Sequence, residues 1–262
     1  MDRRFATLRA AGRRALVVYV TAGHPDVGRS LDLIRGVAAA GADVLEVGVP
    51  FSDPIADGPI IQASSQRALQ AGMTYDGALE LVARAAVPIP IVLFSYLNPI
   101  LAAGPDALDR AAQAGAHGVL VTDLPVGADS EREAWLGASP LAFVRLVAPT
   151  TPAERMAEIA RHGRGFVYLI SRLGVTGVRS DLPGEVPRVV AALRAVTALP
   201  ICVGFGISRP EQAAAVARGA DGVVVGSAVV REAETEVRRA TALVAAMRAA
   251  IDDAGARDAG GM

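Results

Sequence analysis

Lysine is missing from this sequence of 262 residues, so all 26 positions counted as lysine or arginine are arginine. A Schiff base needs the amine of a lysine side chain. The chain therefore cannot hold pyridoxal phosphate covalently, and it cannot use the imine chemistry of a class I aldolase. Any carbon–carbon bond that it cleaves has to break by another route.

Cysteine and net charge are also scarce. The single cysteine, Cys202, excludes a disulfide within the chain and a cysteine-based metal cage, and it is typical of a reducing compartment. A net charge of −1 gives no bulk attraction to nucleic acid or to a membrane surface. No apolar run approaches the ~20 residues that span a bilayer, and the N-terminus lacks the apolar segment of a signal peptide. We therefore expect a cytoplasmic protein with no nucleic-acid or membrane partner.

The three histidines are too scattered along the chain to predict a metal site. His24 follows the first strand pattern, His117 stands at the start of a later strand, and His162 ends a helical pattern. A metal site needs several such ligands brought together. We expect surface or helix-capping roles for these side chains and no bound metal.

Short apolar runs alternate with longer, alanine-rich amphipathic stretches from one end of the chain to the other. Hydrophobic residues make up 52% of the sequence and aromatic residues only 4%, which suits strands buried on both faces. We predict strands over residues 16–21, 44–48, 89–96, 118–122, 141–147, 165–170, 201–205 and 222–226. Helical patterns between them include residues 29–39, 76–85, 106–114, 152–161, 187–196 and 210–218, and a longer final helix is predicted over 231–251.

This alternation predicts an α/β fold, specifically a (β/α)8 TIM barrel with parallel strands. The length is close to the ~250 residues typical of such a barrel. Similar joints at Ala40–Val44, Ala114–Val119 and Arg218–Val223 each lead from a helix into a strand through glycine. An open, doubly wound sheet is the alternative. We expect one domain over residues 1–262, with a frayed tail at residues 252–262.

The second predicted strand contains a carboxylate whose side chain should face the barrel interior. Side chains alternate along a strand, so Val44 and Glu46 share one face while Leu45 and Val47 share the other. The latter two suit packing against helices, which turns Glu46 inward. A buried carboxylate is costly unless it is partnered or protonated. Glu46 is therefore either a catalytic acid/base with a raised pKa or a structural residue satisfied by hydrogen bonds.

The loop after this strand, from Pro50 to Pro59, carries Asp53 and Asp57 among three prolines. Proline restricts the backbone, so both carboxylates are expected to hold defined positions. Asp-Pro and Asp-Gly are also common turn pairs. Because Glu46 lies just upstream, a pair of working carboxylates competes with the plain turn interpretation.

Glycine-rich turns follow the last two predicted strands, at Gly204–Ser208 and at Gly226–Ser227. Barrels that act on phosphorylated substrates often bind the phosphate with these two loops and a nearby helix N-terminus. Glycine lets backbone N–H groups approach the anion, and Ser227 adds a hydroxyl donor. Steric needs at strand ends are the alternative reason for the glycines. The long segment Ser171–Arg179 is either a lid over this end of the barrel or a mobile surface loop.

Three segments resemble the tryptophan synthase α subunit family. They run from Glu46 to Gln62, from Tyr168 to Gly177 and from Gly204 to Ser208, and the first is the most specific. The resemblance implies a catalytic acid/base at Glu46 and a carboxylate facing the indole nitrogen at Asp57. It places a lid threonine at Thr176 and loop positions facing a partner subunit at Asp53 and Pro54. Two residues depart from the family: His24 stands where an aspartate is frequent, and Tyr19 stands where a phenylalanine is frequent, which adds a hydroxyl to the pocket.

The resemblance also implies which residues bind the two ends of the substrate. The phosphate site consists of Gly177, Gly206, Gly226 and Ser227. The indole pocket is lined by Tyr19, Ile61, Phe94, Leu120, Tyr168, Phe205 and Val224.

As a member of this family the chain is expected to be a lyase of tryptophan biosynthesis. It would split indole-3-glycerol phosphate into indole and glyceraldehyde 3-phosphate by a retro-aldol reaction without metal or imine. No cofactor is expected in this chain, whereas the β subunit would carry pyridoxal phosphate within an α2β2 heterotetramer. The alternatives are a sugar-phosphate epimerase, indole-glycerol phosphate synthase, a standalone indole-releasing lyase and a non-catalytic partner. The epimerase would need a cluster of metal ligands, and the synthase would need a lysine, which this chain lacks.

Overall fold

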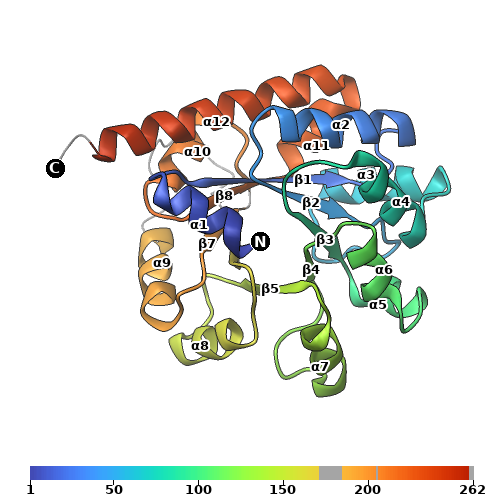
Figure 1. Cartoon of the computed structure of the whole chain (residues 1–262), viewed down its shortest axis with the longest axis horizontal. Coiled ribbons are helices and arrows are strands. Elements are labelled where there is room, and N and C mark those ends of the chain that lie inside the picture. The colour runs from blue at the N-terminus through green and yellow to red at the C-terminus, as the bar shows by residue number, and fades with distance from the viewer. Residues whose placement is uncertain (171–184, 205, 260–262) are drawn as a thin grey trace.

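Eight parallel strands form a closed barrel in chain order, because β1 pairs with both β2 and β8 (Figure 1). The computed structural model describes residues 1–170, 185–204 and 206–259. The predicted (β/α)8 barrel is confirmed, and the open-sheet alternative is wrong. The strands are β1 (Ala15–Thr21), β2 (Val44–Gly48), β3 (Ile91–Ser95), β4 (Gly118–Val121), β5 (Ala142–Val147), β6 (Val167–Ile170), β7 (Ile201–Gly204) and β8 (Gly222–Val225).

The helices form an outer layer around the strands (Figure 1). Their first part comprises α1 (Asp2–Ala10), α2 (Val27–Ala39), α3 (Pro59–Gln70), α4 (Tyr75–Ala85), α5 (Leu97–Ala102), α6 (Ala107–Gln113) and α7 (Ser130–Ala138). The second part comprises α8 (Ala153–Arg161), α9 (Glu185–Val196), α10 (Pro210–Ala217), α11 (Ser227–Thr235) and α12 (Val237–Ala259). None of the described helices has the length and apolar character needed to cross a membrane.

The C-terminal region differs from its prediction in two ways. The long final helix predicted over residues 231–251 is two helices, because Glu236 adopts an extended conformation between α11 and α12. The expected frayed tail is helical up to Ala259, and residues 260–262 lie outside the described residues. Helix α12 packs against α2, α10 and α11, so tertiary contacts stabilise the helix beyond the predicted end.

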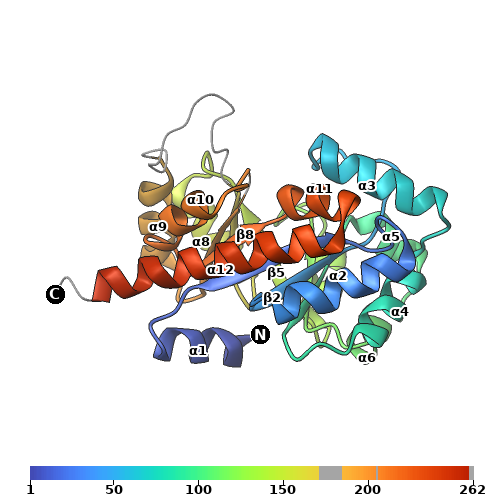
Figure 2. The ribbon, with the colours of Figure 1, turned by 90° about the horizontal axis from the view of Figure 1, so that it is seen from above.

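Side chains fill the barrel interior toward the end where the strands begin. Inward-facing residues from every strand form one cluster with Phe5 and Leu8 of α1. The rings of Phe5 and Phe166 lie 5.7 Å apart, so α1 closes the end at which the strands begin. Figure 2 shows α1 at this end, away from α3 and α11. The interior cluster contains Ala15, Val17, Val44, Val92, Leu120, Val144, Phe166, Cys202 and Val224.

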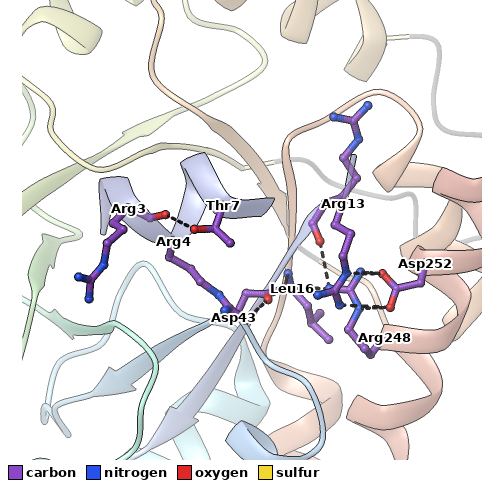
Figure 3. A network of polar contacts seen from close by, with 9 residues as sticks. Arg3, Arg4, Thr7, Arg13, Leu16, Asp43, Arg248 and Asp252 are labelled. Carbon is purple, nitrogen blue, oxygen red and sulfur yellow. Dashed lines mark hydrogen bonds and ion pairs between the residues drawn. The ribbon is translucent and has the colours of Figure 1, made fainter. Parts of the chain in front are cut away.

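A buried ion network joins the two ends of the chain to the barrel (Figure 3). Asp43, directly before β2, accepts hydrogen bonds from Arg4 of α1 at 2.6 Å and from Arg248 of α12 at 2.8 Å. The backbone N–H of Leu16 donates to the same carboxylate at 2.8 Å. Asp252 continues the network through Arg248 and Arg13. This network holds α1 and α12 against the same end of the barrel.

Candidate active site

Glu46 lies inside the barrel, as the alternation along β2 predicts. It stands in register with Tyr19 of β1 and Val92 of β3, and its exposed fraction is 1%. Among the described residues, no hydrogen-bond partner reaches its Oε1 atom. Burial raises the pKa of this carboxyl from 4.5 to about 8, because the charged form loses its hydration. At neutral pH the side chain is therefore largely a neutral acid.

Asp57 is held in the loop after β2 by Tyr96, which directly follows β3. The Tyr96 hydroxyl donates to Asp57 Oδ2 at 3.0 Å and accepts from the backbone N–H of Ala56 at 2.9 Å. The ring of Phe51 packs on the ring of Tyr96, with the centroids 5.0 Å apart. Burial raises the pKa of Asp57 to about 6, although the hydrogen bond from Tyr96 opposes this. The two carboxyl groups thus titrate on either side of neutrality.

The charges of Glu46 and Asp57 influence the hydroxyl groups of two tyrosines inside the barrel, Tyr19 and Tyr168. The pKa of Tyr19 and that of Tyr168 are raised, first by burial and then by the charges of Glu46 and Asp57. Tyr19 comes from β1 and Tyr168 from β6, so the carboxylates and the two rings surround one region at the carboxyl ends of the strands.

Two residues in this region were not identified from the sequence. Tyr96 is not among the candidates from the sequence, although its place directly after a strand is a usable signal. Gln62 enters the sequence analysis only as the last residue of a matching segment. Its amide donates to the backbone carbonyl of Asp57 at 2.9 Å and to that of Pro54 at 3.3 Å. Both residues fix the loop that presents Asp57.

The predicted pocket residues that the structure describes fall into two clusters inside the barrel, and Phe94 contacts both. Tyr19 and Phe94 make an edge-to-face contact with centroids 5.1 Å apart, and Ile61 packs beside them. Leu120, Tyr168 and Val224 belong to the interior cluster below. Glycine makes room for both tyrosines: a Cβ at Gly48 would lie 2.1 Å from the Tyr19 hydroxyl, and one at Gly204 would lie 2.7 Å from the Tyr168 hydroxyl. The predicted pocket residue Phe205 lies outside the described residues.

Three of the four predicted phosphate residues, Gly206, Gly226 and Ser227, lie just after β7 and β8. Gly226 directly precedes α11, and Ser227 is the first residue of that helix. The N-terminus of α11 therefore lies at the carboxyl end of β8. Gly206 follows the neighbouring strand β7 and has a φ of +79°, which favours glycine. A Cβ at Gly226 would lie 3.3 Å from Tyr19 Cβ, which places this end beside the pocket. Thr176 and Gly177 lie outside the described residues.

Asp53 and Pro54 line a surface pocket of about 500 Å³ between the β2–α3 loop and α3. Phe51, Gln62 and the exposed Ile55 also border this pocket, and 85% of the Ile55 surface is exposed.

The expectation of surface or capping roles for the histidines is wrong for His24. Its exposed fraction is 2%, and neither ring nitrogen has a hydrogen-bond partner among the described residues. Burial lowers its pKa, so the ring is neutral at pH 7. The other two fit better, since His162 ends α8 and the exposed His117 accepts a backbone N–H at 3.4 Å. Within the described ranges, no group of three His, Cys, Asp or Glu side chains is placed to hold a metal ion.

Comparison with known proteins decides the family. The sequence model described as tryptophan synthase alpha chain matches residues 5–256. The chain belongs to the tryptophan synthase α chain family. The α chain of Desulfatibacillum aliphaticivorans is 50% identical over 230 residues, which cover 87% of each chain. That of Laribacter hongkongensis is 46% identical over 260 residues, covering 96% of this chain and 98% of the relative.

Solved structures of tryptophan synthase α chains have the same fold. The α subunit from Legionella pneumophila superposes with a TM-score of 0.87 at 36% identity, covering 96% of this chain and 98% of that one. A chain of Mycobacterium tuberculosis tryptophan synthase also has a TM-score of 0.87 at 36% identity, covering 95% and 96%. The resemblance drawn from the three sequence segments is therefore confirmed.

Proposed function

We propose that the chain is the α subunit of tryptophan synthase, a lyase that cleaves indole-3-glycerol phosphate into indole and glyceraldehyde 3-phosphate. The observation that carries this proposal is the Glu46 carboxyl buried inside the barrel, whose pKa burial raises to about 8, together with two interior tyrosines, Tyr19 and Tyr168, whose pKa values are raised by burial and by the charges of both Glu46 and Asp57. Family membership supplies the substrate class, and the absence of lysine leaves acid/base catalysis as the route.

Glu46 performs both proton transfers in this proposal. Its neutral carboxyl protonates indole C3, which converts the ring to a cationic indolenine. The resulting carboxylate then takes the proton of the glycerol hydroxyl next to the ring. The electrons of that O–H bond form the aldehyde, the carbon–carbon bond breaks, and its electron pair returns to the ring. Glu46 regains its proton, so the cycle closes. General acid/base catalysis of this kind supplies about 10²- to 10⁴-fold.

Asp57 stabilises the charge that develops on the ring nitrogen. With a pKa of about 6 it is largely ionised at pH 7, and it accepts the N–H hydrogen bond of the cationic intermediate. The pKa values of the two carboxyls are therefore separated in the direction that their roles require: one is neutral and the other is charged.

The remaining predicted residues bind the substrate. Gly177, Gly206, Gly226 and Ser227 hold the phosphate through backbone N–H groups and one hydroxyl. The indole ring lies among Tyr19, Ile61, Phe94, Leu120, Tyr168, Phe205 and Val224. Thr176, which lies outside the described residues, is the predicted lid residue. The start of α11 next to Tyr19 supports this arrangement, because a helix N-terminus favours an anion.

The proposed partner is the tryptophan synthase β subunit, in an α2β2 heterotetramer in the cytoplasm. Asp53 and Pro54 would face it, and both line the surface pocket between the β2–α3 loop and α3. Pyridoxal phosphate would belong to the β subunit, and this chain would need no cofactor. Adding the β subunit is expected to increase indole production and to shift the elution volume in size-exclusion chromatography.

Indole release from indole-3-glycerol phosphate by the purified chain tests the proposed reaction. Glu46→Gln is expected to reduce kcat at least a hundredfold while the substrate still binds, because the glutamine cannot transfer a proton. Asp57→Ala is expected to cause a severe loss of similar size per folded molecule. Near-normal turnover by Glu46→Gln would refute the assignment, and an Asp57→Ala variant that loses only stability would give Asp57 a structural role.

A further inference from the structure

The hydroxyl group of Tyr19 lies at the end of a buried chain of hydroxyls. Its oxygen is 3.4 Å from Thr21 Oγ1, which is 2.7 Å from Ser64 Oγ. Ser64 Oγ in turn donates to the backbone carbonyl of Ile61 at 2.8 Å. The exposed fractions of Tyr19, Thr21 and Ser64 are 6%, 1% and 1%, so bulk water does not satisfy these groups.

Among these linked hydroxyl groups, one has a hydrogen without a good acceptor. Each hydroxyl carries a single hydrogen, whereas a carbonyl oxygen only accepts. Ser64 donates its hydrogen to the Ile61 carbonyl, and Thr21 donates its own either to Tyr19 at 3.4 Å or to Ser64 at 2.7 Å. In the first case Tyr19 is the acceptor, and its own hydrogen has no partner among these hydroxyls. In the second case the nearest hydroxyl acceptor for that hydrogen is Thr21, at a distance well beyond the usual 2.5–3.0 Å of an O–H···O bond. Tyr19 is thus a donor available to a better acceptor.

Tyr19 is placed between the two ends of the proposed substrate site. The base of its side chain touches the position where a Cβ would lie on Gly226, directly before α11. Its hydroxyl lies over Gly48, two positions beyond Glu46 on β2, and Tyr19 itself is in register with Glu46. A ligand that spans from the start of α11 to Glu46 passes this ring and its hydroxyl.

An apolar ring pocket alone gives no reason for a hydroxyl at this position. Phenylalanine would keep the edge-to-face contact with Phe94 and would avoid burying a polar group with a poor partner. The hydroxyl is therefore useful when a ligand supplies an acceptor there. In a substrate with an indole ring, a glycerol chain and a phosphate, the acceptor between the ring and the phosphate is a glycerol hydroxyl.

We propose that Tyr19 is a specificity-determining residue whose hydroxyl donates a hydrogen bond to a hydroxyl oxygen of the glycerol chain. This inference rests on the proposed function. It predicts that the site distinguishes a hydroxylated side chain from a plain propyl chain of the same length, and that the hydroxyl of Tyr19 provides part of that discrimination.

Binding measurements with two ligands in a Glu46→Gln background test this, because cleavage is then blocked. The ligands are indole-3-glycerol phosphate and indole-3-propyl phosphate, which lacks the glycerol hydroxyls. Adding Tyr19→Phe is expected to weaken binding of the glycerol ligand by about fivefold to tenfold, the range of one lost hydrogen bond. Binding of the propyl ligand should change less than twofold.

Tyr75→Phe in the same background is the matched control. Tyr75 is also buried, and its hydroxyl donates to the Ala107 carbonyl at 2.9 Å outside the site. It should leave the Kd of both ligands unchanged. Equal effects of Tyr19→Phe on both ligands, or none on either, would overturn the inference.

Failure of the proposed function has a different signature. In that case the wild-type chain neither binds nor cleaves indole-3-glycerol phosphate. If the wild-type chain cleaves it and the ratio of the two Kd values is the same with Tyr19 and with phenylalanine, the function stands and only the role of Tyr19 fails.

Discussion

Glu46 carries a free-energy cost that depends on pH. Its pKa is about 8 in the folded chain and 4.5 as the ordinary value, so the folded state binds the proton more tightly than the unfolded state does. For a carboxyl with a raised pKa, folding is most favourable at low pH, and stability falls as the pH rises from 4.5 to about 8. The active site thus lowers stability at the pH where it works.

Glu46→Gln is expected to remove this cost. The variant and the wild-type chain should have similar free energies of unfolding near pH 4. As the pH rises the wild-type chain should lose stability while the variant does not, so that the variant is more stable than the wild-type chain by up to about 5 kcal/mol above pH 8, since one pKa unit corresponds to ~1.4 kcal/mol. Urea unfolding at a series of pH values measures the difference. A difference that stays constant across the series would mean that Glu46 is not a buried neutral acid.

The two carboxyls together predict a bell-shaped pH profile for kcat/KM. Asp57 has to be ionised, so the rate should rise through pH of about 6, and Glu46 has to be protonated, so the rate should fall above about 8. Initial rates of indole release between pH 5 and 9 check this, with a maximum expected near neutrality. A flat profile would contradict the assigned protonation states.

Among the structural elements, the β2–α3 loop depends on the first residue after β3. The Tyr96 hydroxyl satisfies the Ala56 N–H and the Asp57 carboxylate at the same time. Tyr96→Phe removes a hydrogen bond that lowers the Asp57 pKa, so this pKa should rise. The acidic limb of the kcat/KM profile is expected to move to higher pH, with a larger loss of rate at pH 6 than at pH 8.

Tyr75→Phe again provides the control, because it also removes one buried hydroxyl but lies away from Asp57. Both variants are expected to lose about 1 kcal/mol of stability. Only Tyr96→Phe should move the acidic limb. If the two variants gave the same profile, Tyr96 would contribute to stability alone.

For the whole molecule, the network around Asp43 joins both ends of the chain to the barrel (Figure 3). Arg248 is only 8% exposed and contacts Asp43 at 2.8 Å. Asp43→Asn leaves this buried arginine short of a counter-charge, and such losses cost about 3–5 kcal/mol. Urea unfolding should show a loss near the lower end of this range, because Asp252 still pairs with Arg248.

The exposed pair of Glu80 and Arg84 supplies the comparison for this experiment. Glu80→Gln should cost less than about 1 kcal/mol. Neither substitution is expected to change kcat/KM of the folded enzyme, because the Asp43 network lies where the strands begin, whereas Asp57 and the glycine turns lie beyond the carboxyl ends of the strands. A similar small loss for both variants would show that the network does not hold the chain ends.

Local pattern in the sequence was enough to determine the barrel, the inward direction of Glu46 and the positions of the glycine turns. These features depend on the period of side chains along one strand and on the order of strands and helices, which short segments encode. The family could be identified from the sequence for the same reason, because its motifs are continuous segments of the chain. The strand bounds therefore agree with the structure to within about two residues at each end.

Tertiary structure alone decided the features that join distant segments. The bond between Tyr96 and Asp57, the burial of His24, the extension of α12 and the Asp43 network each require residues far apart in sequence to meet. The pKa values of Glu46 and Asp57 also depend on the tertiary structure. They arise from the loss of water around each carboxyl, and that loss is set by every side chain that closes the barrel around it.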